Sequence, residues 1–508
     1  MPTRRAHIAP HSPHGQLAVA LEALREVNEV PDAFPPAVLA EAAAVAAAGA
    51  PPAELDLREI PFVTLDPAGS LDLDQAFHIE HGGGGFILRY AIADLPVYVR
   101  AGGAIDAEAR LRGQTLYLPD GRVPLHPEIL SEDRASLLPG VDRTAYVWTI
   151  PVDATGRAAF EGAPVAEAQV ERALIRSTAR LDYASTQERF DAGAAEGLLA
   201  LLPAFAQLRI EQEQARGGAS LNMPDEEIVR GDHGYEIVRG FPLPVEEWNA
   251  QLSLLTGMAA GALMLAGGIG IHRTMPAPEA EALAEFRTRV AALELPWGAN
   301  MPYGEYLRTV PRDTARGIAV LHAAASLFRG ADYAAFGVPP SDGGGGGSLL
   351  APPPDPAQAA IAAPYAHVTA PLRRLVDRWG LVICEALGAG RPVPDWARDS
   401  LAELPGLMRA SAARAGRLGS EALDRIEAAL LRDRVGEVFP ATVVEVRGAG
   451  ARVQIEDPPI TARLRVPETA PGAAGSPAPR AQLTAGTHTQ VRVVRAEVPS
   501  GEIELEPA

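Results

Sequence analysis

Apolar and polar residues alternate with different periods along the chain, and these periods divide it into regions. Residues 15 to 50 have helical spacing, interrupted at the turn-forming sequence PDAFPP. From residue 60 to residue 150 the pattern changes to short strand-like runs separated by loops. Long alanine- and leucine-rich helical segments dominate from about residue 160 to residue 330, and helical spacing returns from 374 to 433. The pattern predicts a mixed α/β protein in which strands pack with long helices.

The last 75 residues have a different texture from the rest of the chain. About five short alternating strands, beginning at EVFPATVVEV, are separated by turn signals and by a loop rich in proline, alanine and glycine. Five strands in this length suit a small OB-type barrel, a fold that commonly binds oligonucleotides on one face. A small β-domain without a ligand fits the same pattern.

We therefore expect three regions along the chain. These are a helical N-terminal segment at 1–55, a mixed α/β domain at 56–432 and the small barrel at 433–508. A glycine- and proline-rich insertion, SDGGGGGSLLAPPPDP, is expected to form an exposed loop or lid within the second region.

Composition excludes several classes of protein. The 508 residues include a single cysteine, Cys384, so neither an internal disulfide nor a cysteine-based metal site is possible. None of the 45 basic residues is a lysine, which excludes Schiff-base chemistry on a lysine and a Walker-type phosphate site. Any phosphate recognition must therefore use arginine, backbone N–H groups or metal ions.

The expected location is the cytoplasm, and no membrane partner is expected. No apolar run reaches the length needed to span a bilayer, and the N-terminus lacks the pattern of a secretory signal. The net charge of −19 weighs mildly against a nucleic-acid partner. A deep channel can still be locally basic inside an acidic protein, so the net charge does not exclude such a partner.

One short segment concentrates negative charge directly after a strand-like run. In TLDPAGSLDLDQA, Asp66, Asp72 and Asp74 lie within nine residues, and Gln75 follows them. Carboxylates this close repel one another, so a cation, backbone N–H groups or water must neutralise them. Such carboxylates hold the divalent ions that hydrolyse phosphodiesters, and the alternative is a solvated acidic turn. The spacing does not match the D-x-D-x-D-G pattern of an EF-hand.

Four later stretches follow the acidic segment in a fixed order, and they read YAIADLPVYV, DAEARLRGQTLYLPDGRVPLHPEILSEDRASLLPGVDR, RSTARLDYAST and PYAHVTAPLRR. Together these five segments resemble the RNB catalytic domain of one family, the RNase II/RNase R exoribonucleases. The terminal barrel stands where the family has its S1-type RNA-binding domain. The resemblance covers roughly residues 55 to 508 and implies an RNB domain built around a channel, followed by an S1-type OB barrel.

The resemblance implies an activity and a set of site residues. Members of the family thread single-stranded RNA, 3′ end first, into a channel and release nucleoside 5′-monophosphates by magnesium-dependent hydrolysis. Asp66, Asp72, Asp74 and Gln75 match the family's metal-binding cluster, so Mg²⁺ is the expected cofactor, with Mn²⁺ as its substitute. Asp74 and Arg373 match the catalytic positions, and an arginine can fork onto the scissile phosphate.

The resemblance also names residues that would contact RNA. Tyr117, Tyr183 and Leu221 match positions that hold the last nucleotides, and stacking on an aromatic ring accepts any base. Arg374 is expected to support Arg373. The implied partner is RNA with a single-stranded 3′ end, bound by a monomer.

The chain departs from the family pattern at three positions. Gln75 replaces a fourth aspartate, Leu221 replaces a stacking phenylalanine and Gln251 replaces a glutamate. The first change predicts weaker binding of one metal ion, reduced activity or a tolerated substitution, and the second predicts a looser grip on the bases. These changes support a rival interpretation, a catalytically silent RNA-binding protein, against which the retention of Asp74 and Arg373 argues. An acidic scaffold that binds no RNA would leave the barrel and the ordered segments unexplained.

The N-terminal region also differs from the family. Family members usually begin with two cold-shock barrels, and residues 1–55 are too few and too helical to form them. A helical hairpin or a helix-turn-helix-like element is expected there instead. The wider approach to the channel would admit partly duplexed RNA with a 3′ overhang.

Overall fold

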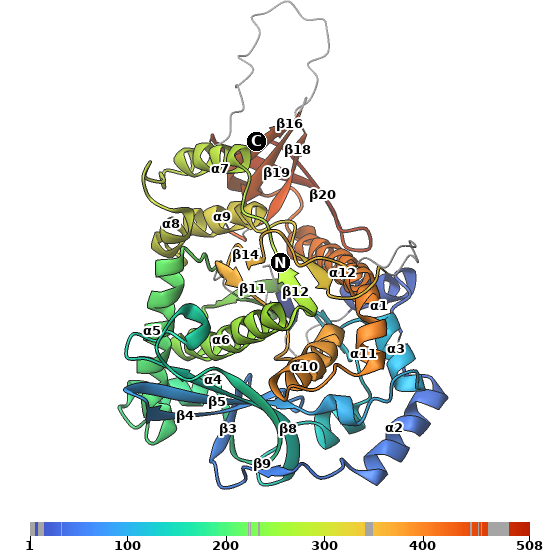
Figure 1. The fold of residues 1–508 in the computed structure, drawn as a ribbon. Coiled ribbons are helices and arrows are strands. Elements are labelled where there is room, and N and C mark those ends of the chain that lie inside the picture. The colour runs from blue at the N-terminus through green and yellow to red at the C-terminus, as the bar shows by residue number, and fades with distance from the viewer. Residues whose placement is uncertain are drawn as a thin grey trace, which may run out of the picture.

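The computed structural model describes most of the chain (Figure 1). The described residues are 6–8, 15–31, 33–221, 223, 225–231, 234–340, 349–447, 450–455, 457–458, 460–465 and 487–508. The glycine run of the predicted insertion and the predicted loop inside the terminal barrel lie outside these ranges.

A barrel formed by one sheet lies at the base of the molecule (Figure 1). Its strands follow the order β2-β9-β3-β4-β5-β8, and β9 also pairs with β8, which closes the sheet. The parallel pairing of β3 with β9 brings Asp66 opposite Asp182, so both strands end at the same edge of the barrel. The strands are β2 Leu55–Asp56, β3 Phe62–Asp66, β4 Gln75–Gly82, β5 Gly85–Ala93, β8 Asp142–Val152 and β9 Gln169–Asp182.

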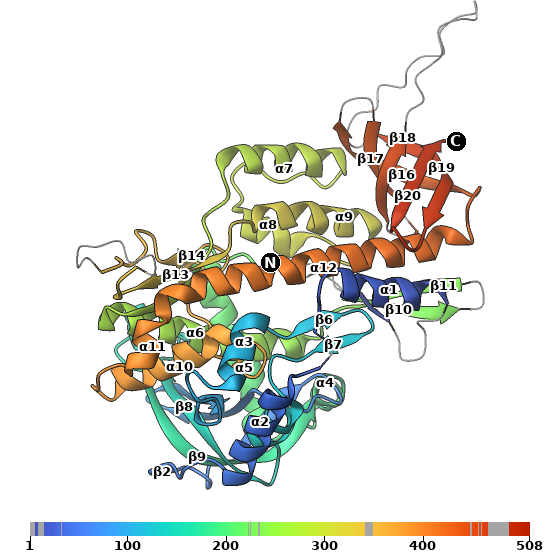
Figure 2. The same ribbon diagram turned by 90° about the vertical axis from the view of Figure 1, so that its right-hand side faces the viewer.

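Long helices cover this barrel and connect it with the rest of the molecule (Figures 1 and 2). Buried apolar side chains such as Leu88, Trp148, Leu252 and Trp379 join barrel strands, α6 and α10 in one core. The helices are α3 Ala104–Arg112, α4 Tyr183–Asp191, α5 Leu198–Arg216, α6 Pro244–Gly267, α7 Ala280–Ala292, α8 Tyr303–Thr309, α9 Ala315–Ala324, α10 Leu375–Gly388, α11 Asp395–Asp399 and α12 Leu404–Arg432.

Helix α6 is apolar because it is a core helix. Among the described helices it is the one that is long and apolar enough to cross a membrane by length and composition. The expectation that no apolar run reaches that length is therefore wrong for α6 on those two measures. More than half of the helix's apolar window is buried inside the protein, where Leu252, Leu255 and Met264 contribute to the core.

Several short strands form small sheets between the helices. The region from 160 to 330, predicted as mainly helical, also contains β9, β10, β11 and β12. In sequence order the pairs are β6 Leu116–Leu118 with β7 Gly121–Val123, β10 Asp225–Gly231 with β11 Gly234–Gly240, β12 Gly270–Thr274 with β13 Asp332–Phe336, and β14 Ala357–Gln358 with β15 Ala363–Pro364. The hairpin of β6 and β7 projects toward the acidic segment.

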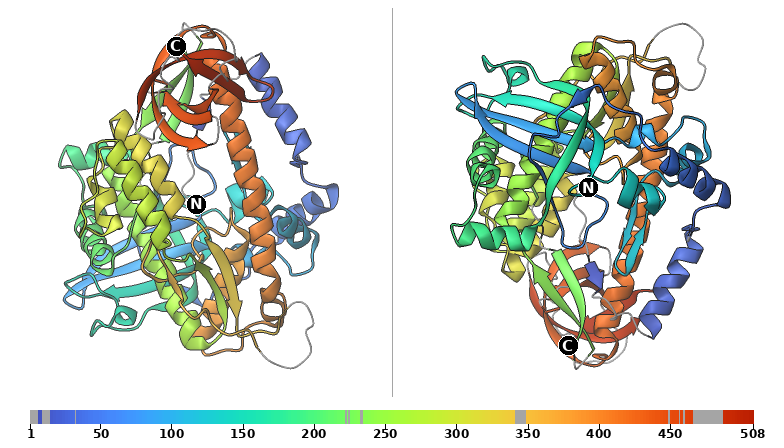
Figure 3. Two further views of the ribbon diagram at one scale, coloured as in Figure 1. Left: turned by 90° about the horizontal axis from the view of Figure 1, so that it is seen from above. Right: turned by 90° about the horizontal axis from the view of Figure 1, so that it is seen from below.

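The N-terminal region contains one short strand and two helices. Strand β1 Ala6–Ile8 pairs with β10, and it precedes α1 Gln16–Val27 and α2 Pro36–Ala48. Leucines on one face of α1 are buried against α12, and the two helices lie side by side in Figures 2 and 3. Helix α2 packs instead near α3 and the barrel, where Val38 and Ala42 are buried.

A second closed barrel forms the C-terminal end of the chain, at the far end of the long helix α12 (Figure 2). Its strand order, β16-β17-β18-β20-β19, confirms the predicted five-stranded OB-type barrel. The strands are β16 Val438–Arg447, β17 Gly450–Ile455, β18 Thr461–Arg465, β19 His488–Glu497 and β20 Glu502–Pro507.

Candidate active site

The acidic segment connects β3 to β4 at one edge of the central barrel. Asp66 is the last residue of β3, and Gln75 is the first residue of β4. The connection turns where Ser70 N–H donates to the Pro67 carbonyl, and Gly69 supplies the positive φ of 82° that this turn requires. The three aspartates are therefore placed by the end of a strand and by a tight turn.

Asp74 is buried against the segment that precedes α10. Its side chain is 3% exposed, and its Oδ1 accepts a hydrogen bond of 2.8 Å from the backbone N–H of Leu372. Its Oδ2 lies 3.5 Å from Nε of Arg373. Burial raises the pKa of Asp74 well above its usual range, while Arg373 and the Leu372 N–H oppose that rise. An ionised Asp74 is thus stabilised by one cation and one backbone N–H donor. That donor, Leu372, lies 298 positions away in the sequence.

Asp66 has an oxygen that no described group satisfies. Its Oδ2 is buried and has no hydrogen-bond partner. Burial raises the pKa of Asp66 to about 6, Arg373 lowers it, and Asp72 raises it further. A buried carboxylate oxygen without a partner is costly, and a cation is one means of satisfying it.

Asp72 is held by an arginine from the β6–β7 hairpin. Nη1 of Arg122 lies 2.9 Å from Oδ1 of Asp72, and Nη2 of Arg122 pairs with Glu132. Asp72 therefore faces a guanidinium, unlike the unsatisfied oxygen of Asp66.

Arg373 and Arg374 are neighbours with different surroundings. The side chain of Arg373 is 48% exposed and lies beside both Asp74 and the Tyr117 hydroxyl. Arg374 turns toward the protein interior, where its Nε lies 2.5 Å from Oδ2 of the fully buried Asp377. Asp377 also accepts a 2.7 Å hydrogen bond from the Ala370 N–H. The pair of Arg374 and Asp377 thus fixes the segment from which Arg373 reaches the aspartates.

Gln75 uses both ends of its amide in hydrogen bonds. Its Nε2 donates to the Thr369 carbonyl at 2.5 Å, and its Oε1 accepts from the Tyr90 hydroxyl at 3.0 Å. The Tyr90 hydroxyl also lies 2.6 Å from the Ser253 hydroxyl. Gln75 therefore fastens β4 to the same segment that positions Arg373, and its predicted metal role stays a prediction.

The two predicted stacking tyrosines both lie at this edge of the barrel. Tyr117 projects from β6, is 46% exposed, and has Arg373, Asp72 and Asp74 in its electrostatic surroundings. Tyr183 begins α4, directly after β9, and its hydroxyl accepts from Nδ2 of Asn249 at 3.3 Å. Burial raises the pKa of Tyr183 to about 12, the hydrogen bond from Asn249 lowers it, and Asp66 contributes to the rise.

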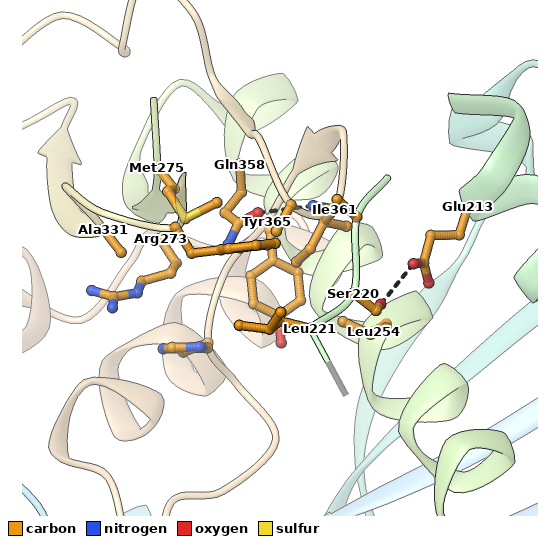
Figure 4. A pocket seen from close by; sticks show the side chains of 14 residues that line it. Glu213, Ser220, Leu221, Leu254, Arg273, Met275, Ala331, Gln358, Ile361 and Tyr365 are labelled. Atoms are coloured by element: carbon orange, nitrogen blue, oxygen red, sulfur yellow. Dashed lines mark hydrogen bonds between the residues drawn. The ribbon is translucent and has the colours of Figure 1, made fainter. Parts of the chain in front are cut away.

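Leu221 lines a pocket of about 380 Å³ instead of contacting the aspartates (Figure 4). Tyr365, Arg273 and Glu213 line the same pocket, and Figure 4 shows the hydrogen bond from Ser220 to Glu213. Buried Gln251 donates to the other oxygen of Glu213 at 3.0 Å. Glu213 on α5 therefore supplies a carboxylate to this wall of the pocket. Its hydrogen-bond partner is Gln251, the residue that stands where the family pattern has a glutamate.

Comparison with known proteins places this chain in a family. The model of the RNB domain matches residues 54–382, well over half of the chain. The chain belongs to the RNB family. The model of the RNase II-type exonuclease C-terminal S1 domain matches residues 437–477, so the predicted family and the predicted S1-type barrel are both confirmed.

Relatives of this RNB protein are longer and are distant in sequence. Ribonuclease R of Escherichia coli is 26% identical over 475 residues, which cover 86% of this chain and 55% of that protein. The chain thus spans about half the length of such curated relatives. Mycoplasma genitalium RNase R in complex with ribose methylated single-stranded RNA has a TM-score of 0.80 at 18% identity, covering 99% of this chain and 85% of that one. Yeast Ssd1, a pseudonuclease, has a TM-score of 0.63 at 15% identity, covering 90% and 56%. These two likenesses show a shared fold.

The residues of this RNB site fit a magnesium ion by their chemistry. Mg²⁺ binds hard oxygen ligands and in nucleic-acid enzymes commonly uses one or two carboxylates together with substrate phosphates. Asp74 supplies a buried carboxylate and Asp66 a partly buried one, whose Oδ2 is buried and lacks another partner. Within the described part of the chain, no three His, Cys, Asp or Glu side chains gather as a metal-binding group. The fit therefore rests on two carboxylates, with Asp72 occupied by Arg122.

Sequence reasoning missed several residues that shape this RNB site. Arg122 could have been found, because Leu-Pro-Asp-Gly is a hairpin turn signal that places the residue after it opposite Tyr117. Tyr90, Asn249 and Glu213 give no such local signal, since each acts through a partner that is distant in the sequence.

Proposed function

We propose that this protein is a divalent-metal-dependent exoribonuclease that degrades single-stranded RNA from its 3′ end and releases nucleoside 5′-monophosphates. The observation that carries the proposal is the placement of half-exposed Arg373 beside buried Asp74, with Asp66 and Tyr117 around them. Membership of the RNB family supports it. We further propose that the enzyme works processively, as a monomer, in the cytoplasm.

The proposed chemistry assigns a role to each group of this site. Asp66 and Asp74 hold Mg²⁺, or Mn²⁺ in its place, and Asp72 and Gln75 lie around them. An ion held there would supply positive charge at the scissile phosphate and would lower the pKa of an attacking water. Arg373 has N–H donors beyond the Nε that faces Asp74, and these can bind the phosphate and stabilise its developing negative charge.

The RNA is positioned by groups that accept any base. Tyr117 and Tyr183 offer aromatic rings for stacking near the carboxylates. The pocket lined by Leu221 and Tyr365 is the proposed site for a nucleotide of the 3′ end. Arg374 supports binding by fixing the position of Arg373 through its pair with Asp377. Substrates include RNA with a single-stranded 3′ overhang beside a duplex.

A labelled-RNA assay tests this function. A 5′-labelled RNA with a 3′ overhang next to a duplex is incubated with Mg²⁺ and the native protein, Asp74→Asn, or the control Asp395→Asn, whose aspartate lies on α11 and is 81% exposed. The native protein and the control should shorten the RNA progressively from its 3′ end, and EDTA should stop the reaction. Asp74→Asn should lose at least about 10³-fold in rate. Shortening at the native rate by Asp74→Asn contradicts the proposal.

The stability of Asp74→Asn separates lost chemistry from lost folding. Because burial raises the folded pKa of Asp74 above its unfolded value, its ionised form destabilises the fold at pH values above the unfolded pKa. At pH 7 the neutral asparagine should therefore melt no earlier than the native protein. If the variant is inactive but its melting temperature is unchanged or raised, the lost activity reflects a role of Asp74 in the reaction and not a loss of folding.

The second candidate is an RNA-binding protein without nuclease activity. The observations that favour it are the engagement of both ends of the Gln75 amide and the guanidinium on Asp72. A neighbour in fold, yeast Ssd1, is a pseudonuclease. In the same assay this function predicts that the RNA shifts on a native gel but is not shortened by the native protein.

A further inference from the structure

The β6–β7 hairpin presents one face to the aspartates and the other to the protein core. Tyr117 and Arg122 are directly opposite each other in its antiparallel register, so both project from the same face. Leu116 and Leu118 are buried on the other face in a cluster that includes residues of α1 and α12. The hairpin is therefore supported from behind by the N-terminal helix and the longest helix.

A second contact fastens the tip of this hairpin. Asp120, in the two-residue loop between β6 and β7, lies 2.5 Å from Nη2 of Arg25 on α1, and both side chains are largely buried. Ion pairs in such protected places hold their geometry better than exposed ones. The backbone that carries Arg122 is thus fixed from both its apolar face and its turn.

Arg122 forms an ion pair with Asp72, a carboxylate that could otherwise bind a metal ion at this site. Its Nη1 lies 2.9 Å from Oδ1 of Asp72, and Glu132 binds its Nη2. Glu132 and Asp72 are each mostly shielded from solvent. In the described part of the chain, no third acidic side chain joins Asp66 and Asp74 as a metal ligand. Asp72 is the side chain that would have to become the third ligand, and it is already paired with the Arg122 guanidinium.

We propose that Arg122 competes with the divalent ion for Asp72 and thereby sets the metal affinity of the site. This inference rests on the proposed function, because it concerns the ion which that function requires. A positive charge in contact with a carboxylate neutralises it and repels a cation nearby. Arg122 acts on the ion through Asp72, so it is a positioning residue.

Metal binding without RNA tests the competition directly. MnCl2 is titrated into the 508-residue protein at low ionic strength, and free Mn²⁺ is measured by electron paramagnetic resonance. Arg122→Met keeps the length of the side chain but removes its charge, and it should bind Mn²⁺ about tenfold more tightly than the native protein. Arg122→Lys restores a charge and should return the affinity toward the native value.

Two further variants show whether the effect runs through Asp72. In the Arg122→Met background, Asp72→Asn should abolish the gain in affinity, because the released carboxylate is then absent. Arg134→Met is the matched control, since Arg134 is a more exposed arginine nearby that pairs with Asp133 at 3.8 Å. It should leave Mn²⁺ binding unchanged. Thermal melting of each variant confirms that it is folded.

The outcomes separate this inference from the proposed function. Equal Mn²⁺ affinity in the native protein and Arg122→Met overturns the role of Arg122, as does a gain that survives Asp72→Asn. If the native protein still binds Mn²⁺ and shortens RNA in that case, the proposed function stands without it. If no variant binds Mn²⁺ and the native protein does not shorten RNA, the metal-dependent function fails together with the inference.

Discussion

The two barrels of this RNB protein place their charged residues in opposite ways. At the edge of the central barrel, Asp74 is buried, Asp66 is partly buried, and both lie near Arg373. In the C-terminal barrel, Arg452 and Arg463 are exposed and lie directly opposite each other on β17 and β18. Buried charges cost free energy unless they are paired, whereas exposed charges cost little.

This difference indicates what each barrel contributes. Carboxylates whose pKa values are raised by burial do not stabilise a fold, and such groups are typical of functional sites, which agrees with the chemistry proposed at the central barrel. A pair of exposed like charges is slightly unfavourable and suits an anionic partner such as a phosphate backbone. We therefore expect substitutions at the first barrel to change the rate of reaction and substitutions at the second to change binding.

The largest effect is expected at Arg373. Arg373→Met removes the guanidinium beside Asp74 and should lower kcat by about 10²- to 10³-fold, because the developing phosphate charge loses its donor. Single-turnover kinetics with saturating RNA measure this rate directly. Arg373 also offsets the burial of the Asp74 charge, so the melting temperature should fall, but by less than in Arg374→Met, because Arg373 is half-exposed and lies 3.5 Å from Asp74.

The neighbouring arginine provides the contrast. Arg374→Met leaves the fully buried Asp377 without its partner and should destabilise the fold by about 3–5 kcal/mol, measured by urea unfolding. Equal effects of the two substitutions on both rate and stability would count against the different roles that their contacts indicate.

The second effect concerns the link between the barrel and the segment that bears Arg373. Gln75→Asp removes the donor to the Thr369 carbonyl and brings a carboxylate near that carbonyl oxygen. It should therefore destabilise the protein by about 1–3 kcal/mol in urea unfolding, although it restores the residue type that the family pattern has at this position. Gln75→Glu, which keeps the length of the side chain but also lacks the donor, should behave in the same direction. A rise in stability with either variant contradicts the assigned hydrogen bonds.

The sequence predicted local features of this site better than distant ones. Helical and strand periods located the N-terminal helices and the five-stranded barrel, and the acidic motif led to residues that the fold brings together with Arg373. The role of Gln75 depends on Thr369, which lies 294 positions away, so no local pattern could reveal it. The same holds for buried Gln251, whose partner Glu213 lies on another helix. A residue that differs from a family pattern can thus be fixed by a contact that only the tertiary structure shows.

The smallest effect is expected at the C-terminal barrel, where it tests whether this barrel contributes to RNA binding and not to the rate of reaction. Arg463→Met removes one exposed positive charge opposite Arg452, so it should weaken RNA binding about two- to fivefold and reduce the salt dependence of binding by about one unit of slope. Binding is measured by fluorescence anisotropy at several salt concentrations, and kcat at saturating RNA should stay unchanged. Arg398→Met is the control, because Arg398 is an exposed arginine on α11 that pairs with Asp395 and Asp399. A loss of kcat in Arg463→Met with an unchanged salt slope would mean that this barrel acts on the chemistry and not on the grip of the RNA.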